Sequence, residues 1–221
     1  SVYYMSKPPV PALLLKAMQV VKPTTILSVP LIIEKIYRNS IVPTIRKSRM
    51  LSWMNKNMNW LMCKVIGLKL KKTFGGHLSF FGIGGAKLDI EVERFLLKAG
   101  FPYAIGYGLT ETSPLLSFTV GRSRFPGSIG VPVRNVELRL DNVNPETGEG
   151  EIVAKGPNVM LGYYKDPERT RKAFTKDGWF RTNDLACLDE KGRYFIKGRL
   201  SNMILGASGE NIYPEEIEQV I

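Results

Sequence analysis

The stretch HLSFFGIGGAKLDIEVERFLLKAGFPYAIGYG, residues 77–108, decides the fold class of this 221-residue chain. Its first part, HLSFFGIGG, is a run of strand-forming residues that enters a glycine turn. LDIEVERFLLKAG has the spacing of an amphipathic helix that ends on Gly100, and FPYAIGYG has the pattern of a second strand. A strand, a glycine turn, a helix and a strand make a βαβ unit, and such crossovers build parallel sheets. The stretch therefore predicts an α/β fold.

The residues before this unit predict helices around one short strand. PPVPALLLKAMQVVK (8–22) has helical spacing after prolines, and TTILSVP (24–30) is typical of a short buried strand. Successive helices are predicted over LIIEKIYRNSIVPTIRK (31–47) and MLSWMNKNMNWLMCKVIGLKLKK (50–72). The second helix has Met and Trp on one side and Lys on the other. Core packing is the simpler explanation of the Met and Trp stripe, and a membrane-surface face is the alternative.

The pattern changes after about residue 119, where short β runs separated by turn signals replace the helical periods. VELRL (136–140) and EIVAKG (151–156) flank a polar loop, and DLACLDEKGRYFIKG (184–198) predicts a hairpin. DPERTRKAF (166–174) predicts one helix, with Asp166 as the N-cap residue. This region is expected to form a smaller antiparallel sheet or barrel.

Composition excludes several classes of protein. With 44% apolar residues the chain can bury a core, and it has no run of 18 uncharged apolar residues and no signal peptide. Cys63 and Cys187 lie far apart, so neither a disulfide framework nor a zinc cluster is indicated, and a reducing, intracellular compartment is expected. His77 is the only histidine and no GxSxG motif is present, which argues against a serine hydrolase. The chain begins without Met inside an apparent strand, so we expect a piece of a longer protein.

The net charge of +11 is concentrated in one third of the chain. Residues 1–75 contain 13 Lys and Arg against one acidic residue, whereas residues 76–221 contain 18 against 19. A basic third is typical of a nucleic-acid face, a membrane-facing surface or a surface that attracts anionic substrates, and it is also typical of a simply solvated face. No aromatic-interleaved strand or recognition-helix pattern supports nucleic acid.

Residues that suit a nucleoside phosphate are scattered over predicted strand ends and turns. They supply an aromatic face, a hydroxyl, a metal-binding carboxylate, an acceptor for vicinal hydroxyls and a fixed cation. The glycine turn alone is weak evidence, because neither GxGxxG nor GxxxxGK[ST] is present. Each residue also has a structural explanation as a core, capping or surface residue. The candidates are the turn at 84–86, Tyr107, Thr110, Glu111, Asp184 and Arg199.

Six ordered motifs in this chain resemble those of one family. They are GIGGAKL, YGLTE, GSIGVPV, GEIVAKGPNVMLGYY, GWFRTNDL and YFIKGRLSNMILGASGENIYPEEIE. Their order over residues 80–221 resembles the adenylate-forming superfamily of acyl-CoA synthetases, nonribosomal-peptide adenylation domains and luciferases. Together with SVPLIIEKIY near the start, the last motif looks most like long-chain fatty acid–CoA ligases.

The resemblance implies an organisation in three parts. The α/β part would be the C-terminal portion of the large AMP-binding domain, with a βαβ sheet layer and a small antiparallel β subdomain. The first residues of a mobile C-terminal α+β domain would follow. The expected boundaries are 1–118 for the α/β subdomain, 119–199 for the antiparallel β subdomain, and 200–221 for the hinge and the start of the C-terminal domain.

The resemblance also implies roles around the phosphates and the ribose. Thr110 would bond the α-phosphate, and Glu111 would hold Mg²⁺. Asp184 would accept both ribose hydroxyls, because a carboxylate has two suitable oxygens. Arg199 would anchor ribose or phosphate.

Other positions would surround the adenine. Gly84, Gly85 and Ala86 would form a backbone wall beside adenine and the acyl group, and Tyr107 with Gly108 would flank the ring.

Further roles fall near the hinge and the end of the chain. Ile196 would pack near the nucleoside, and Gly209 with Glu210 would approach the pantetheine arm of coenzyme A. The hinge position, commonly Asp or Lys in the family, is Ser201, and Asn183 replaces the glycine that usually precedes the ribose-binding Asp.

The implied reaction is ATP-dependent ligation of a fatty acid to coenzyme A through acyl-AMP, with Mg²⁺. One alternative is that the same fold acts on an amino acid or transfers the acyl group to a carrier protein. Another is that residues 1–75 form a basic membrane-binding module. Nucleic acid is not expected as a partner. The family's phosphate loop and C-terminal lysine are missing from this sequence. We therefore expect the isolated chain not to catalyse adenylation. We also expect a cytoplasmic location, with peripheral contact to the inner membrane face as an alternative.

Overall fold

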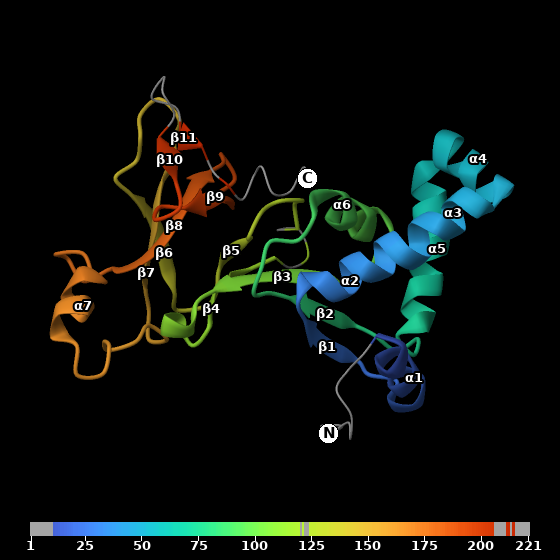
Figure 1. Cartoon of the computed structure of the whole chain (residues 1–221), viewed down its shortest axis with the longest axis horizontal. Helices are drawn as coiled ribbons and strands as arrows, with labels where there is room; N and C mark the ends of the chain where they lie inside the picture. Colours follow the sequence, from blue (N-terminus) through green and yellow to red (C-terminus); the bar gives the residue numbers. More distant parts are fainter. Residues whose placement is uncertain (1–10, 120, 122–123, 206–210, 213, 215–221) are drawn as a thin grey trace. The chain divides into compact units, whose positions relative to one another are not determined.

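The computed structural model describes residues 11–119, 121, 124–205, 211–212 and 214 (Figure 1). The chain divides into two compact units, Ser1–Ala104 and Ile105–Ile221. The apparent strand at the start of the chain lies outside the described residues. The boundaries expected at residues 118 and 199 stay predictions.

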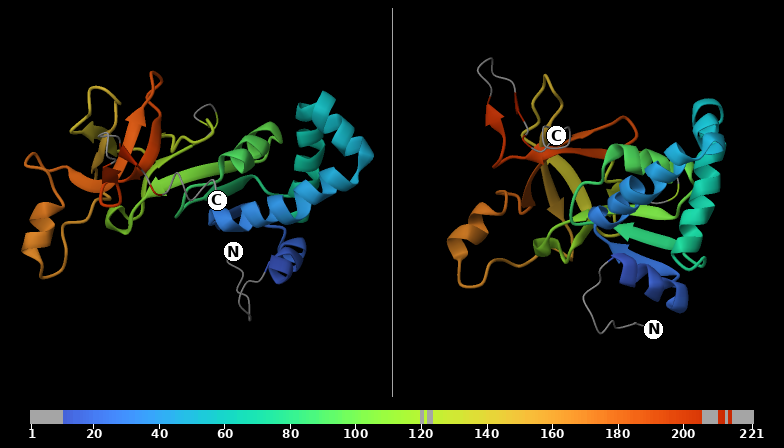
Figure 2. Two further views of the ribbon diagram at one scale, coloured as in Figure 1. Left: turned by 45° about the horizontal axis from the view of Figure 1, so that its top comes forward. Right: turned by 45° about the vertical axis from the view of Figure 1, so that its right-hand side comes forward.

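Helices make up most of the first unit. In chain order they are α1 (Pro11–Val21), α2 (Pro30–Ile36), the π-helical segment η1 (Tyr37–Ile41), α3 (Val42–Lys47), α4 (Arg49–Asn57), α5 (Asn59–Thr73) and α6 (Ile90–Lys98). Figures 1 and 2 show α4 as the part of the group α3–α5 that lies farthest from the strands β1 (Thr25–Ser28) and β2 (Phe80–Ile83).

The single helix expected over residues 50–72 is two helices, because the chain breaks at Met58. Its φ of −141° and ψ of 50° are not helical. The residue before the break, Asn57, donates from its side chain to the Trp53 carbonyl at 2.9 Å, a local bond of the kind that competes with helical hydrogen bonds. Ser48 caps α4 by accepting from the Leu51 amide at 3.3 Å.

The strands of the first unit pair as the βαβ pattern requires. β1 and β2 are parallel, with Thr25 opposite Phe80, and the Phe81 amide donates to the Pro102 carbonyl just before β3 (Tyr103–Gly108). Beneath these strands, the rings of Phe74, Phe81 and Phe101 pack with centroids 5.4 to 5.8 Å apart. The predicted strands β2 and β3 and the helix between them are confirmed, whereas β1, which was expected to be buried, is partly exposed, with Leu27 78% exposed.

A glycine lets α5 approach the end of α6 closely. A Cβ atom at Gly67 would lie 2.5 Å from the Ala99 carbonyl oxygen, so no larger residue fits without movement. The same side of α5 is buried in the first unit. Its buried residues are Met62, Cys63, Ile66, Gly67 and Leu70.

The second unit is mainly antiparallel sheet. β4 (Leu115–Phe118) and β5 (Val131–Pro132) continue antiparallel from β3, which gives a mixed sheet with strand order β1-β2-β3-β4-β5. A four-stranded antiparallel sheet contains β6 (Glu137–Asp141), β7 (Gly150–Lys155), β8 (Phe180–Leu188) and β9 (Tyr194–Arg199). The remaining elements are η2 (Thr110–Thr112), α7 (Pro167–Lys172), β10 (Ile204–Leu205) and β11 (Asn211–Ile212).

These sheets confirm an α/β fold with a mixed sheet and an antiparallel sheet. The predicted β8–β9 hairpin and the Asp166 cap of α7 are present, since Asp166 accepts from the Arg169 amide at 2.9 Å. No helix within the described residues is both long and apolar enough to cross a bilayer. A hydrophobic core holds the second unit together, formed by Tyr107, Leu116, Ile129, Val136, Ile152, Ala154, Ala186 and Tyr194.

Candidate functional site

The segment GYGLTETSP (residues 106–114) makes a tight connection between β3 and β4, and this connection requires glycine at position 108. A Cβ atom at Gly108 would lie 1.7 Å from the Pro114 carbonyl oxygen, well inside any allowed contact. The chain then makes the 3₁₀ turn η2 and passes through Ser113, whose φ of 56° is left-handed. The turn therefore has one compact shape, set by the backbone.

Two polar side chains fix this turn from inside. The buried Thr112 hydroxyl accepts from the Leu109 amide at 3.0 Å and donates to the Pro114 carbonyl at 2.7 Å. Asn158 donates from Nδ2 to the carbonyls of Thr112 and Leu115, both at 2.8 Å. Sequence reasoning missed Asn158, although it lies in the quoted motif GEIVAKGPNVMLGYY. Thr110 and Glu111 are thus presented by a rigid turn.

Three of the predicted site residues are in direct contact. The Tyr107 hydroxyl donates to Asp184 Oδ2 at 2.7 Å, and Arg199 Nε lies 3.3 Å from Asp184 Oδ1. Strand pairing produces part of this contact, because Asp184 on β8 is directly opposite Arg199 on β9. The Arg199 side chain is 54% exposed and that of Asp184 9%. The carboxylate is therefore held inside, beside a cation that reaches solvent.

Burial dominates the electrostatics of this group. Burial raises the pKa of the Asp184 carboxyl, while the Tyr107 hydrogen bond and the Arg199 charge act in the opposite direction. Burial also raises the pKa of Tyr107 well above its ordinary value, and the nearby Asp184 charge adds to that effect. Tyr107 thus remains a neutral donor at physiological pH. Both Asp184 oxygens already have a partner, yet each keeps a lone pair for a further donor.

The Tyr107 ring lies in the core of the second unit rather than on an open surface. It is only 9% exposed and packs with the apolar cluster of that unit. Such a ring offers little area for stacking. The Tyr107 hydroxyl is the part of the side chain that contacts Asp184, and the place of the ring beside adenine stays a prediction.

Glu111 makes a second tyrosine–carboxylate contact. The Tyr163 hydroxyl donates to Glu111 Oε1 at 3.0 Å, and the Arg169 guanidinium lies 4.0 Å from the Tyr163 ring centroid. The Met160 amide donates to the Glu111 carbonyl at 2.8 Å, which fixes the backbone. Partial burial raises the pKa of Tyr163, and its bond to Glu111 raises it further. Tyr163 was not among the predicted site residues, while the neighbouring Thr110 is exposed.

An ion pair between a buried carboxylate and a partly exposed arginine supports the strand that positions Asp184. Glu151, 5% exposed, pairs with Arg181 through Oε2 and accepts from the Asn183 amide through Oε1 at 3.1 Å. Arg181 also lies 3.3 Å from Asp141. The pairing of β7 and β8 is irregular between Glu151 and Val153. The Glu151 carboxylate therefore holds the backbone directly before Asp184.

The two departures from the family pattern touch each other. Asn183 Nδ2 donates to Ser201 Oγ at 2.9 Å, and the Leu200 amide donates to the Asn183 carbonyl at 2.9 Å. Asn183 has a φ of 63°, a left-handed conformation that suits glycine and that Asn tolerates better than most residues. The side chain that replaces glycine therefore bonds the side chain at the expected hinge.

The remaining predicted residues have contacts of their own or lie outside the described residues. Gly84, Gly85 and Ala86 belong to the first unit, where the Gly84 amide donates to the Ser28 carbonyl at 3.1 Å and Gly85 has a φ of 84°. Ile196 packs against the apolar core of the second unit. The coenzyme A positions Gly209 and Glu210 lie outside the described residues.

The helix after the glycine turn has an occupied N-terminus. Asp89 Oδ1 accepts from the amides of Glu91 and Val92 at 2.8 and 3.1 Å. The amides of Glu91 and Val92 are therefore bonded within the chain.

Glu111, the predicted magnesium ligand, does not belong to a larger group of metal-binding side chains among the described residues. In the described part of the chain, no group of three or more His, Cys, Asp or Glu side chains could hold a metal ion. Mg²⁺ is commonly bound by one or two carboxylates together with substrate phosphates. Glu111 fits that pattern, as a half-buried carboxylate fixed on the rigid turn.

Comparison with known proteins gives a consistent result. The family described as AMP-binding enzyme matches residues 1–164. A long-chain-fatty-acid–CoA ligase of Escherichia coli O6:H1 is 42% identical over 150 residues, which are 66% of this chain and 26% of that protein. A chloroplastic long-chain-fatty-acid–acyl-carrier-protein ligase of Arabidopsis thaliana is 35% identical over 178 residues, 73% of this chain and 24% of that protein.

Solved structures show the same fold. The ATP-bound MatB protein from Rhodopseudomonas palustris superimposes with a TM-score of 0.70 at 30% identity, covering 97% of this chain and 38% of that chain. The chain thus spans about a quarter of the length of the two curated relatives.

Proposed function

We propose that this chain, which belongs to the AMP-binding enzyme family, forms the nucleotide-binding part of an acid–thiol ligase. The observation that carries the proposal is the Tyr107–Asp184–Arg199 cluster. It combines a buried acceptor carboxylate with an exposed cation, which suits a ribose next to a phosphate. The family match supports the same assignment.

The reaction proposed has two displacements. A carboxylate oxygen of the acid attacks the α-phosphorus of ATP, the bond to the β-phosphate oxygen breaks, and pyrophosphate leaves with its electron pair. The product is acyl-AMP. A thiolate then attacks the acyl carbon, the bond to the phosphate oxygen breaks, and AMP leaves. Catalysis of this kind requires positioning and neutralisation of phosphate charge more than covalent chemistry.

Each side chain has a task that its contacts permit. Asp184 accepts the ribose hydroxyls with the lone pairs that remain after it has bonded Tyr107 and Arg199. Tyr107 acts through its hydroxyl, which orients the Asp184 carboxylate. Arg199 contacts ribose or phosphate from the solvent side, and Thr110 bonds the α-phosphate.

Glu111 holds Mg²⁺ in this proposal, with Tyr163 orienting its carboxylate. When bound, the ion neutralises charge on the phosphate oxygens. Gly84, Gly85 and Ala86 remain proposed neighbours of the adenine, together with Gly108. Gly209 and Glu210 remain proposed contacts of coenzyme A.

The proposed acid is a long-chain fatty acid and the proposed acceptor is coenzyme A. The name of the Escherichia coli relative supports both. The Arabidopsis relative is named for an acyl-carrier protein, which keeps a carrier-bound thiol as the second candidate acceptor. Coenzyme A and the carrier-bound acceptor both react through a thiolate, so the acylation step is the same for each.

Binding of a non-reactive adenylate tests the nucleotide site on the chain itself. We expect a palmitoyl sulfamoyl-adenosine mimic to bind the 221-residue chain in isothermal titration calorimetry. Asp184→Ala should weaken that binding about tenfold or more, because it removes the charged acceptor of the ribose hydrogen bonds. Asp177→Ala is the matched control, since Asp177 is an exposed carboxylate that pairs with Arg139. Equal affinity of the two variants would contradict the assignment of Asp184.

Substrate and acceptor are tested on a protein extended to the length of its relatives. ATP–pyrophosphate exchange with fatty, aryl and amino acids reports the acid, and thioester formation with coenzyme A or acyl-carrier protein reports the acceptor. The proposal requires fatty acids to give the fastest exchange and coenzyme A to be acylated. Faster exchange with an amino acid would remove the fatty acid from the proposal.

A further inference from the structure

The outward face of α4 and α5 exposes large apolar side chains on two consecutive helices. Met50 and Trp53 on α4 are 67% and 58% exposed, and Trp60 and Leu68 on α5 are 58% and 67% exposed. Single exposed apolar residues are ordinary, but several on adjacent helices indicate a surface that contacts something else. Tryptophan is enriched at membrane–water interfaces, where its ring is apolar and its N–H can be hydrated.

On α5 the apolar side chains alternate with lysines along one side. Trp60, Lys64 and Leu68 follow each other at four-residue steps, so they lie on the same face of the helix. Lys64 Nζ lies 5.2 Å from the Trp60 ring centroid. Lys69 and Lys72 are also exposed on this helix. The inward side is already packed in the first unit, so the outward side presents only apolar and basic groups.

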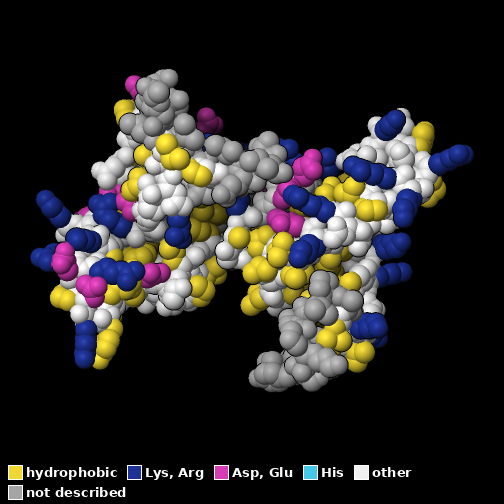
Figure 3. Space-filling view, in the orientation of Figure 1, with side chains coloured by type: hydrophobic (Ala, Val, Ile, Leu, Met, Phe, Trp, Pro, Cys, Tyr) yellow, Lys and Arg dark blue, Asp and Glu magenta, His cyan; other side chains and the backbone are white. Residues whose placement is uncertain are grey.

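The charge around this face has a single sign. Residues 35–88 contain eleven Lys and Arg and no Asp or Glu. In the described part of the chain, no lysine of α4 or α5 forms a salt bridge. Figure 3 shows Lys and Arg side chains along the outer edge of α3, α4 and α5, with no acidic side chain among them on the visible face. Burying several lysines in a protein interior is costly, so a hydrated anionic partner fits better than another apolar protein surface.

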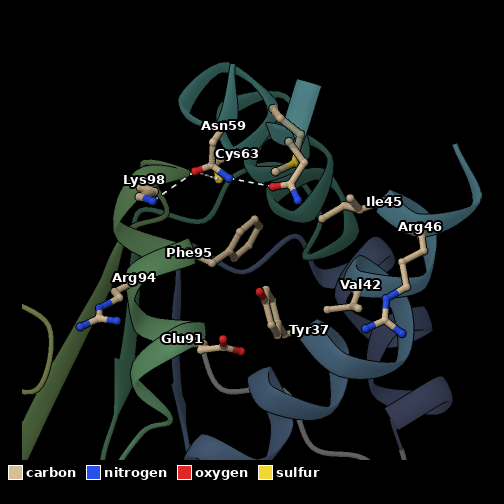
Figure 4. Close-up of a pocket in the computed structure, with 12 residues that line it drawn as sticks. Tyr37, Val42, Ile45, Arg46, Asn59, Cys63, Glu91, Arg94, Phe95 and Lys98 are labelled. Carbon is tan, nitrogen blue, oxygen red and sulfur yellow. Dashed lines mark hydrogen bonds between the residues drawn. The ribbon is translucent and has the colours of Figure 1, made fainter. Parts of the chain in front are cut away.

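A pocket on the inner side of the same helices does not explain this face. The cavity has a volume of about 410 Å³, and its lining includes Tyr37, Phe95 and Glu91. In Figure 4, Arg46 and Arg94 point away from its centre, whereas Tyr37 and Phe95 point inward. The third lining cation, Lys98, donates to Asn59 Oδ1 at 3.1 Å, so the pocket does not gather its cations around one point for an anionic ligand.

We propose that the outward face of α4 and α5 binds the surface of an anionic lipid bilayer. The Trp53 and Trp60 rings lie at the level of the headgroups, and the lysines reach lipid phosphates while their methylene stems cover apolar surface. The chain binds peripherally, because none of its described helices can cross a membrane. This binding is independent of the proposed function. The face is made of Met50, Trp53, Lys56, Trp60, Lys64, Leu68, Lys69 and Lys72.

Vesicle flotation of the 221-residue chain tests the binding. The chain should float with phosphatidylcholine vesicles that contain phosphatidylglycerol and stay behind with phosphatidylcholine alone. Added NaCl should release it, because salt screens exposed charges. In a Trp179→Phe background, the fluorescence of Trp53 and Trp60 should shift to shorter wavelength with the anionic vesicles. Failure to float with anionic vesicles at low salt would overturn the proposal.

Matched lysine variants locate the contact. Lys64→Gln with Lys69→Gln should lower the partition coefficient about twentyfold, since each basic residue near an anionic surface contributes about a factor of five. Lys176→Gln with Lys191→Gln removes the same charge from exposed positions of the second unit. That control should change partitioning by about twofold or less. An equal loss in both pairs would show attraction by net charge alone and would overturn the assignment to this face.

Tryptophan variants separate a bilayer from other polyanions. Trp53→Ala with Trp60→Ala should reduce vesicle binding about tenfold, because interfacial aromatic anchors are lost, and should leave binding to heparin or poly(U) unchanged. Circular dichroism and thermal unfolding verify the fold of every variant. Unchanged vesicle binding by this variant would contradict a lipid surface and support a general polyanion site. Should the variant fail to fold, the vesicle-dependent fluorescence shift decides instead, and its absence would overturn the proposal.

Discussion

The two units use ionic groups in opposite ways. In the helices α3–α5 all Lys and Arg side chains except the partly buried Lys71 are exposed, and residues 35–88 contain no Asp or Glu. In the second unit, carboxylates are paired with arginines, as in Glu151 with Arg181 and Asp184 with Arg199. Exposed cations of one sign act at a distance on an approaching partner, whereas pairs that contain a buried carboxylate hold their side chains in one arrangement. The net charge of the whole chain, +11, therefore describes the charge environment of neither region.

Gly108→Ala is the change with the largest expected effect, because it disrupts the tight turn of the second unit. The new Cβ would meet the Pro114 carbonyl oxygen, so the turn that presents Glu111 must rearrange. We expect a loss of about 4 kcal/mol in the free energy of unfolding, measured by urea denaturation. Gly192→Ala is the control: its φ of 72° is strained for Ala, but its Cβ would meet nothing within 4 Å. That variant should lose about 1–2 kcal/mol.

Glu151→Ala sharpens the comparison by removing one partner of a buried pair. Arg181 would keep only Asp141, and the Asn183 amide would lose its acceptor. We expect about 3 kcal/mol of destabilisation and weaker binding of an adenylate mimic, because the backbone before Asp184 is released. Asp177→Ala breaks an exposed pair and should change the unfolding midpoint little. Similar midpoints for both variants would contradict the distinction between buried and exposed pairs.

Asp184→Asn tests whether the buried Asp184 carboxylate lowers the stability of the fold while it serves nucleotide binding. Burial raises the pKa of Asp184 in the folded chain above its ordinary value of 3.8. The folded chain therefore retains this proton more readily than the unfolded chain, and stability falls as pH rises from 3.8 towards the folded pKa. An asparagine does not titrate, so the variant does not lose stability in this way. The difference in melting temperature between the variant and the unchanged protein should therefore grow in favour of the variant as the pH rises from 3.8 towards the folded pKa of Asp184. The affinity of the variant for the adenylate mimic should fall.

Lys64→Gln with Lys69→Gln should have the smallest effect on stability. Both side chains are exposed, and neither forms a salt bridge with a described residue. We expect less than about 0.5 kcal/mol of change in the free energy of unfolding and no change in binding of the adenylate mimic. A larger loss of stability would mean that these lysines contribute to the fold of the first unit.

Local patterns predicted much of the fold. The helix over residues 88–100 and the hairpin around β8 and β9 follow from spacing and turn residues. The break at Met58 was not predicted, because Met is a good helix former and the interruption depends on side-chain bonds of the neighbouring Asn residues. The strand β4 was also missed, since its pairing with β3 depends on contacts across a turn.

The candidate site was predicted in part for a similar reason. Asp184 and Arg199 could be named as residues, yet their contact depends on the register of two strands. The roles of Asn158 and Tyr163 depend on contacts with the turn some fifty residues earlier in the chain. Burial of the Tyr107 ring is also a tertiary property, so an aromatic that suits stacking in the sequence is a core residue in the structure.

The close approach of Gly67 to Ala99 has a geometric consequence. The spacing between α5 and the end of α6 at this point is set by the absence of a side chain, since any Cβ atom at position 67 would meet the Ala99 carbonyl oxygen and the Ala99 Cβ.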